Sequence, residues 1–190
     1  MNKGRLEAFT DAIVAIAATI MVLELHTPIT NNWQGFVEEW PTFLAYIISF
    51  VMIYVVWYSH HNLFKKAEVI TSRTYLLNGL WIFFLTLVPF LTAWVGSAAD
   101  ASLPEFLYPL NLLLWSGAFH LLDRQILRDN PEATKDSSTR LFDRIFMYGG
   151  YVLCMVLAFF YPPLSLYVIG AVSVVMIIRI FTAKEARADE

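Results

Sequence analysis

The sequence is poor in charged residues. Of its 190 residues, 15% are Asp, Glu, Lys or Arg, whereas 58% are hydrophobic and the mean hydropathy is +0.57. A soluble domain of average composition carries about 25% charged residues, and so few charges do not cover a globule in water. The deficit excludes an ordinary soluble domain and predicts an all-α protein embedded in lipid.

Cysteine is almost absent as well. The chain has one, Cys154, which excludes an intramolecular disulfide and any cysteine-based metal cluster. Because this residue lies in an apolar run, we predict that it is a small, buried packing residue.

The apolar residues gather into six runs, each long enough or nearly long enough for a helix to cross the hydrocarbon core, which takes about 17–25 residues. The runs are Ala8–Leu25, Pro41–Tyr58, Leu76–Val95, Phe106–Leu122, Ile145–Tyr161 and Leu164–Phe181. Only Tyr161-Pro162-Pro163 separates the last two, and this proline pair predicts a helix end with a tight reversal. We therefore expect one domain, residues 1–190, that is a polytopic membrane protein with six transmembrane helices.

The basic residues decide the orientation of these helices. All 13 Lys and Arg residues lie before the first run, between the second and third, between the fourth and fifth, or near and after the end of the sixth. With six spans they fall on one side of the membrane, whereas five spans would scatter them over both. The opposite loops hold only the acidic charges Glu24, Glu38, Glu39, Asp100 and Glu105. By the positive-inside rule, both termini are cytoplasmic.

The first run carries an acidic residue, Asp11, about one helical turn inside its apolar segment. An ionised carboxylate there costs several kcal/mol unless it is paired, and Arg5 lies too far around the helix for an ideal pair. We therefore expect a partner from a neighbouring helix, either His60 or His61 at the inner end of the second run or Asn78 near the inner end of the third. The alternative is that Asp11 caps the helix start and faces water.

Aliphatic residues form a stripe along this first helix. Ile16, Ile20 and Leu23 recur at spacings of four and three, which places them on one face. On a lone helix such a stripe most often meets lipid or a neighbouring helix. If copies of the helix surround a shared axis, each position becomes a ring, and rings of Ile and Leu hold back ions by dewetting. Small residues such as Ala12 and Ala15 allow helices to approach closely.

The start of the helix also carries a motif. Arg5-x-x-x-Phe9-Thr10-Asp11 resembles the R-x-x-x-F-[S/T]-D signature of the transmembrane protein 175 family, the lysosomal potassium channel and its bacterial and archaeal homologues. Residues 16–23, IAATIMVL, are similar to the pore helix of that family, and residues 57–61, WYSHH, to its Trp/His segment. The specific motifs lie in the first two helices, whereas the helix count and orientation agree over the whole chain.

The resemblance implies a passive K⁺ channel in the cell membrane, a homotetramer whose pore is lined by the first helix of each subunit. Ile16 then falls on the narrowest hydrophobic ring, Ile20 and Leu23 form further rings toward the outside, and Thr19 falls on a threonine layer that helps to favour K⁺ over Na⁺. The polar network that holds the pore helix in place is expected to include Arg5, Phe9, Thr10, Asp11, His60, His61 and Asn78. Whether His60 or His61 takes the histidine role in this network stays open.

No T-V-G-Y-G segment is present to strip water from K⁺ with ordered carbonyl groups. Selection would then depend on a pore lined by side chains, where an apolar ring penalises the more strongly hydrated Na⁺. We therefore expect weak to moderate selectivity. The outer acidic residues, Glu24 among them, either raise the local cation concentration or simply belong to a hydrated loop.

Three other classes of membrane protein compete with a selective channel. A non-selective cation leak channel would use the same pore. A secondary transporter would usually show inverted repeats, broken helices and charges at the midplane, and none is visible in the sequence. An enzyme is disfavoured because no H-E-x-x-H motif occurs and the positions of the four histidines do not predict a metal-binding cluster of three. We expect no catalysis, no cofactor and no bound metal, with K⁺ as the permeant ion. The expected partners are other copies of this chain, lipid and monovalent cations, and no nucleic acid.

Overall fold

The computed structural model describes residues 2–133 and 141–188, and within these ranges every regular secondary-structure element is a helix. Seven helices follow one another, and no strand occurs between them in the described ranges. They are α1 (Lys3–Leu23), α2 (Trp33–Glu38), α3 (Trp40–Lys65), α4 (Ser72–Ser97), α5 (Ser102–Asp129), α6 (Leu141–Phe160) and α7 (Pro162–Ala188). The predicted all-α class is confirmed for this part of the chain, and each of the six apolar runs lies on one long helix, apart from the last two residues of the first run and the last residue of the fifth.

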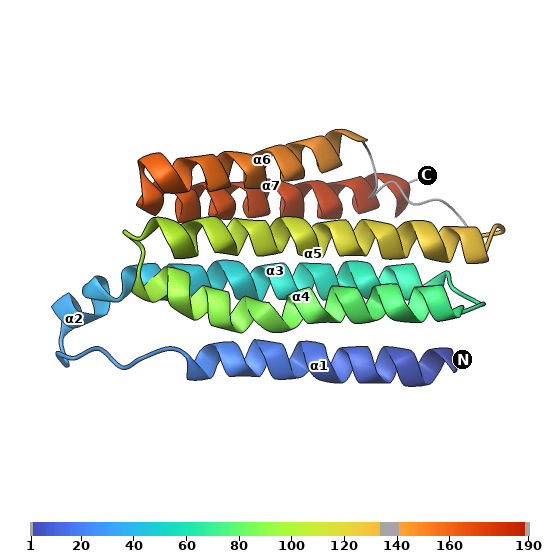
Figure 1. The fold of residues 1–190 in the computed structure, drawn as a ribbon, viewed down its shortest axis with the longest axis horizontal. Helices are drawn as coiled ribbons and strands as arrows, with labels where there is room; N and C mark the ends of the chain where they lie inside the picture. The colour runs from blue at the N-terminus through green and yellow to red at the C-terminus, as the bar shows by residue number, and fades with distance from the viewer. Residues whose placement is uncertain (1, 134–140, 189–190) are drawn as a thin grey trace.

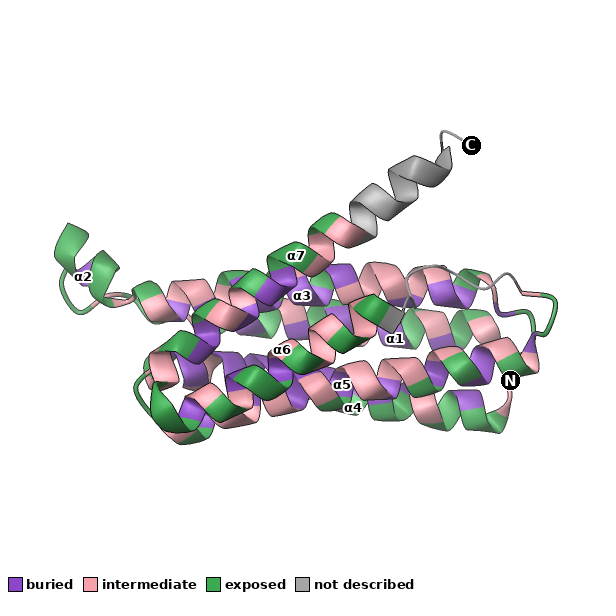
Figure 2. Ribbon diagram, turned by 90° about the horizontal axis from the view of Figure 1, so that it is seen from above, coloured by how far each residue is buried: buried purple, intermediate pink, exposed green. Residues whose placement is uncertain are grey.

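The six long helices follow one another in alternating directions, with α1 along one edge of the bundle and α6 and α7 along the other (Figure 1). Helix α1 therefore begins at the same end of the bundle as α3 ends and α4 begins. We call this end, which carries Lys3, Lys65 and Arg73, the basic end. The short helix α2 extends beyond the opposite end (Figure 2). Seen from above, α6 and α7 lie obliquely across the other helices (Figure 2).

Five of the long helices are long and apolar enough to cross a membrane: α1, α3, α4, Phe142–Phe160 of α6 and Pro162–Arg179 of α7. Helix α5 has 28 residues, enough to span a bilayer, but it is more polar. Three of its polar residues, Glu105, Asn111 and Gln125, are buried within the chain. A sixth span and cytoplasmic termini stay predictions.

Local sequence signals explain where several of these helices begin. The Asn2 side chain caps α1 by accepting a hydrogen bond from the Arg5 backbone N–H, and Thr71 caps α4 in the same way. Helix α6 ends at Phe160 and α7 begins with Pro162, so the predicted reversal at the proline pair is confirmed. Proline fits the first turn of a helix because its missing N–H has no intrahelical partner there.

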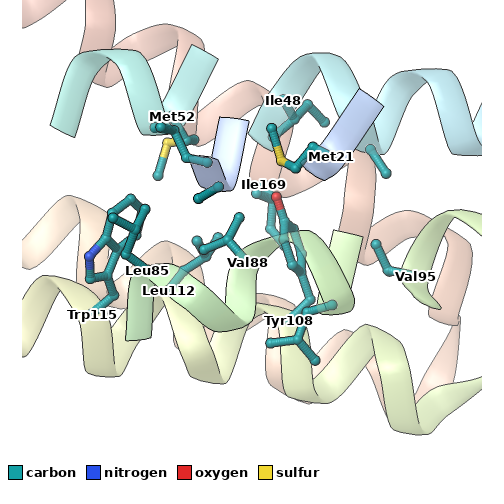
Figure 3. Packing of buried hydrophobic residues seen from close by; sticks show 14 of the residues in the cluster. Met21, Ile48, Met52, Leu85, Val88, Val95, Tyr108, Leu112, Trp115 and Ile169 are labelled. Atoms are coloured by element: carbon teal, nitrogen blue, oxygen red, sulfur yellow. The ribbon is translucent and has the colours of Figure 1, made fainter. Parts of the chain in front are cut away.

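The core of the bundle lies between α3, α4 and α5 and is closed on its sides by the other helices. Large side chains dominate it: Trp81 and Trp115 are buried, and Tyr108, Leu85 and Leu112 are fully inaccessible. Figure 3 shows Trp115, Tyr108, Leu85 and Leu112 packed with their neighbours. Cys154 is also fully buried and free of any disulfide, which confirms the packing role predicted for it.

The connection between α3 and α4 is held against the end of α5 by Asn130. Its Oδ1 accepts from the backbone N–H groups of Glu68 and Val69, at 2.8 and 2.7 Å, and its Nδ2 donates to the carbonyls of Val69 and Ile126. The polar, turn-forming residues Asp129-Asn130-Pro131 and Ser137-Ser138 predict a hydrated loop over Arg128–Arg140. Instead, Asn130 is only 8% exposed, and residues 134–140 lie outside the described ranges.

The neighbouring Asp129 ties the same connection to α5. One carboxylate oxygen accepts from the hydroxyls of Thr71 and Thr74, both at 2.7 Å, and the other accepts from Gln125. Desolvation acts to raise the pKa of Asp129, but the hydrogen bonds from Thr74, Thr71 and Gln125 together bring it below its ordinary value. The carboxylate is therefore an ionised acceptor under physiological conditions.

Replacing Asn130 with alanine should destabilise the protein by about 1–3 kcal/mol, because two backbone N–H groups lose their acceptor in a partly buried site. Thermal unfolding in detergent measures the change. Asn130→Asp is the matched variant, since it keeps the accepting oxygens and loses only the two donations, and it should lie between wild type and alanine. Equal stability of all three proteins would contradict this role.

The structure corrects the expectation for Glu105, which the sequence placed among hydrated outer charges. Its side chain is 0% exposed, and neither carboxyl oxygen has a hydrogen-bond partner among the described residues. The hydroxyl of Ser165 on α7 donates to the Glu105 backbone carbonyl. Glu105 is therefore an unsatisfied polar group inside the bundle, and it does not contribute charge to an outer surface.

Replacing Glu105 with methionine, which has a similar length and no polar oxygen, should raise the free energy of unfolding by about 1–2 kcal/mol, because the desolvation cost of the carboxyl group disappears. The increase would appear as a higher unfolding temperature. Glu24→Met is the control, because Glu24 is exposed and its replacement should leave stability unchanged. A strongly destabilised Glu105→Met protein would show that the carboxyl group has a partner.

Candidate pore-lining helix

Helix α1 has one face against the bundle and the rest open. It packs mainly on α4 and α3, and its buried residues, spaced four, four, three and four apart, are Leu6, Thr10, Val14, Ala17 and Met21. This is the period of one helical face. The side chains on the rest of α1 lack cover from their own chain.

The predicted constriction residues lie on this open part of α1. Ile16, Ile20 and Leu23 are 55%, 40% and 79% exposed, so the aliphatic stripe points away from the subunit. Ala12 and Ala15, beside the stripe, are exposed as well. The structure thus brings the three residues together on one surface. An uncovered aliphatic surface on a membrane helix meets lipid or further copies of the chain.

Thr19 lies beside this stripe and is also exposed. Its hydroxyl is 3.0 Å from the Ala15 carbonyl oxygen and 2.8 Å from that of Ile16, to which it donates. With its single proton directed back to the helix, the oxygen keeps its lone pairs for an acceptor role. An exposed oxygen of this kind is a suitable ligand for a partly dehydrated cation.

A buried polar cluster anchors the other face of α1 near the basic end. Asn78 of α4 donates from Nδ2 to the hydroxyl of Thr10 at 2.9 Å, and the Thr10 hydroxyl donates to the Leu6 carbonyl. Asn78 Oδ1 lies 2.8 Å from Nε2 of His60 on α3. Because an amide oxygen can only accept, His60 donates this hydrogen bond from Nε2. Thr10, Asn78 and His60 are at most 2% exposed, and we call them the inner anchor.

Aromatic rings hold the imidazole of His60 in this position. The ring lies between Phe64 and Trp81, with centroid distances of 4.4 and 4.5 Å and interplanar angles of 22° and 26°. The stacking fixes the plane of His60 and so the direction of its hydrogen bond to Asn78. The sequence did not reveal this sandwich, because Trp81 comes from another helix, although Phe64 stands one turn after His60.

Asp11 lies at the edge of this arrangement and has a different partner from those expected. Its Oδ1 accepts a hydrogen bond of 2.8 Å from the indole Nε1 of Trp57 on α3, and Trp57 stacks on His61 with an interplanar angle of 18°. Its hydrogen bond therefore does not go to His60, His61 or Asn78, and the Asp11 side chain is exposed within the single chain. The two histidines thus take separate roles, one in the inner anchor and one against Trp57.

Two other residues of the predicted polar network lie outside the inner anchor. The side chains of Arg5 and Phe9 are exposed, and the backbone N–H of Arg5 serves the helix cap. The indole of Trp57 is the functional group that the sequence interpretation missed. Two features of the sequence could have indicated it: Trp57 stands one turn before His61, and its indole N–H is a hydrogen-bond donor.

The described residues contain no group of three or more His, Cys, Asp or Glu side chains that could hold a metal ion. Thr10 and Asp11 form hydrogen bonds to other helices, whereas Thr19 bonds within α1. Between residues 12 and 23, the exposed side chains of α1 are aliphatic apart from Thr19, and the exposed Arg5, Phe9 and Asp11 lie nearer the basic end. Such a surface can exclude or pass small ions when copies of it face each other.

Comparison with known proteins agrees with the motifs. The family described as endosomal/lysosomal potassium channel TMEM175 matches residues 5–89, a range that contains α1 from Arg5 onward, all of α3 and the whole inner anchor. A potassium channel from Chryseobacterium sp. (strain P1-3) is 35% identical over 168 residues, which cover 87% of this chain and 88% of the relative. The endosomal/lysosomal proton channel TMEM175 of Bos taurus is 34% identical over 101 residues, 47% of this chain and 21% of that protein.

The fold agrees as well. The crystal structure of a lysosomal potassium-selective channel TMEM175 homolog from Chamaesiphon minutus superimposes with a TM-score of 0.80 at 27% sequence identity, and the match covers 93% of this chain and 97% of that one. The sequence relationship to the Chryseobacterium channel spans nearly all of both proteins. This chain therefore belongs to the TMEM175 family.

Proposed function

We propose that this protein is a passive, potassium-selective channel of the cell membrane, in which four copies surround an axis and each contributes α1 to the pore. The observation that carries the proposal is the orientation of α1. Its aliphatic stripe is uncovered by its own subunit, whereas its other face is fixed by the inner anchor. The names of the bacterial relatives support the choice of K⁺.

In the assembled pore, Ile16, Ile20 and Leu23 would form successive rings. An aliphatic ring gives an ion no replacement for its hydration water, so a narrow ring is a barrier that grows with the strength of hydration. Na⁺ holds its water more strongly than K⁺ and meets the higher barrier. Thr19 would offer an oxygen ligand between two of these rings, which lowers the barrier for the less hydrated ion. Selectivity should therefore be weak to moderate.

The inner anchor supplies the rigidity that such a pore needs. Rings of side chains discriminate between ions only if the helix that carries them holds one rotation and one distance from the axis. Thr10 is fixed to α4 and, through Asn78, to His60 on α3. Ala12 and Ala15 would let neighbouring α1 helices approach closely. The proposal includes six spans with both termini in the cytoplasm, and no cofactor, enzyme activity or nucleic-acid partner.

Flux through reconstituted liposomes tests the function. Purified protein should pass K⁺ down an imposed gradient in either direction, faster than Na⁺, with Cs⁺ measured alongside. Equal K⁺ and Na⁺ flux would point to a non-selective leak channel, and flux with a fixed coupling ratio to another ion would point to a secondary transporter. A pH-sensitive dye in the same vesicles reports proton flux. This flux is measured because the bovine relative is named a proton channel. Native mass spectrometry tests the tetramer.

A further inference from the structure

A second buried polar cluster joins four helices in the half of the bundle away from the basic end. The Tyr108 hydroxyl of α5 is 2.6 Å from Oγ of Ser49 on α3, and Ser49 Oγ is 2.7 Å from Oγ1 of Thr92 on α4. Thr92 Oγ1 also lies 3.9 Å from the sulfur of Met21 on α1 and 2.7 Å from the Val88 carbonyl oxygen. We call Met21, Ser49, Thr92 and Tyr108 the outer cluster.

The outer cluster is buried throughout. Ser49 and Tyr108 are 0% exposed, Met21 is 1% and Thr92 is 5%, and the Tyr108 hydroxyl points toward Met21 and Ile48 (Figure 3). A hydroxyl group buried in apolar surroundings must find partners among its neighbours, so these three hydroxyls constrain each other. The Thr92 hydroxyl has one proton, and the Val88 carbonyl and the Ser49 hydroxyl, both at 2.7 Å, are much closer to it than the Met21 sulfur. These two hydrogen bonds fix the Thr92 side chain, and Met21 packs against it.

Along α1, this cluster is separate from the inner anchor. Thr10 and Met21 are 11 residues apart, about 16 Å along the helix axis, and the buried residues between them, Val14 and Ala17, are apolar. Beyond Met21 the helix ends at Leu23 and a non-helical connection follows to α2. Met21 is therefore the last buried residue of α1, and the contact with Thr92 is the last polar contact that holds it.

The rotation of α1 at Met21 decides where its neighbours point. Ile20 and Leu23 stand one residue before and two after Met21, so a rotation that moved the sulfur off Thr92 would turn both side chains by the same angle. Met has a flexible, polarisable side chain and by itself specifies position poorly. The hydroxyl groups of Ser49 and Thr92 supply the fixed surface against which it packs.

We propose that Ser49 and Thr92 are positioning residues that fix the rotation of the outer half of α1 and thereby set the geometry of the rings at Ile20 and Leu23. The effect on ion selection rests on the proposed channel function. The effect on α1 itself does not, because it follows from contacts within one subunit.

Thr92→Val and Thr92→Ser form the decisive pair of variants. Valine keeps the shape and removes the hydroxyl group, whereas serine keeps the hydroxyl group and removes the methyl group. In hydrogen–deuterium exchange on the purified channel, Thr92→Val should raise exchange of residues 17–23 roughly fivefold, because the hydrogen-bonded surface against which Met21 packs is lost. Residues 5–12, next to the inner anchor, should be unchanged. Thr92→Ser should restore the wild-type pattern.

The same variants are measured for K⁺ and Na⁺ flux. Thr92→Val should lower the K⁺/Na⁺ permeability ratio by about threefold or more, an effect in the range of one lost hydrogen bond, and Thr92→Ser should not. Thr86→Val is the matched control, because Thr86 lies on the same helix, is exposed and, among the described residues, bonds only to the Phe83 carbonyl. Ser49→Ala should reproduce Thr92→Val, and the double variant should add little to either.

Three results would overturn the positioning role. They are unchanged exchange over residues 17–23 in Thr92→Val, exchange that rises uniformly along α1, and an equal effect of Thr86→Val. If Thr92→Val does not fold, exchange over residues 17–23 is compared between Ser49→Ala, Thr86→Val and wild type instead. A wild-type protein that passes no K⁺ would refute the proposed function, and the exchange result would still decide whether the outer cluster holds α1.

Discussion

Replacing Ile16 with asparagine is expected to raise K⁺ flux by about tenfold, which corresponds to about 1.4 kcal/mol of barrier, and to bring the K⁺/Na⁺ permeability ratio close to one. In the proposed tetramer, four amide groups would replace the narrowest aliphatic ring, hold water and offer oxygen ligands to any cation. Ile16 is 55% exposed and touches none of the anchoring contacts, so the fold should survive. Single-channel recording and liposome flux measure the two effects.

Val22→Asn is the control for this experiment. Val22 lies on the same helix and is 47% exposed, but it stands six residues from Ile16, about 120° around the helix. The change introduces the same amide group off the stripe, and conductance and selectivity should stay as in wild type. Unchanged conductance and selectivity in Ile16→Asn, or equal changes in both variants, would remove Ile16 from the pore.

The helices of this bundle could be predicted because lipid imposes a simple rule. Backbone groups in a bilayer must be satisfied within the segment, so each apolar run becomes a helix, and the prolines at 162 and 163 mark the one ambiguous boundary. The stripe of Ile16, Ile20 and Leu23 follows from the helical period alone. The resemblance contributed the family, which the comparisons confirm.

Hydrogen-bond partners between helices could not be predicted in the same way. Sequence spacing places Asp11, Trp57, His60 and Asn78 near one end of the bundle, but the rotation of each helix decides which groups meet. The sequence favoured a histidine or Asn78 for Asp11, whereas the indole of Trp57 reaches it. The aromatic faces around His60 were likewise hidden, because Phe64 and Trp81 come from two helices.

Burial in the turn regions was the second failure of sequence reasoning. Glu105 and Asn130 stand in sequence patterns typical of hydrated loops, because each is next to a proline, and Asn130 also follows the charged Asp129. In the structure both are at least nine-tenths buried, since α5 extends beyond the predicted run Phe106–Leu122 at both ends. The apolar run marks the lipid-facing length of a helix and does not reveal where polar ends pack against neighbours.

Replacing Asn78 with alanine should have the largest effect on stability, about 2–4 kcal/mol of destabilisation, because it leaves polar groups unpaired and opens a cavity. The Nε2–H of His60 would lose its acceptor and the Thr10 oxygen its donor, both in sites at most 2% exposed. The unfolding temperature in detergent and the fraction of assembled protein on a sizing column should fall together.

Asn62→Ala provides the matched control, since Asn62 stands two residues after His60 on α3 and has no hydrogen-bond partner among the described residues. Its replacement should change stability by less than about 0.5 kcal/mol. The triple variant Thr10→Val, His60→Phe and Asn78→Leu removes all three polar groups together and should be more stable than Asn78→Ala alone, because apolar replacement of every partner avoids unpaired groups. If Asn78→Ala were as stable as Asn62→Ala, the inner anchor could not be what fixes α1, and the rigidity required of the pore would need another source.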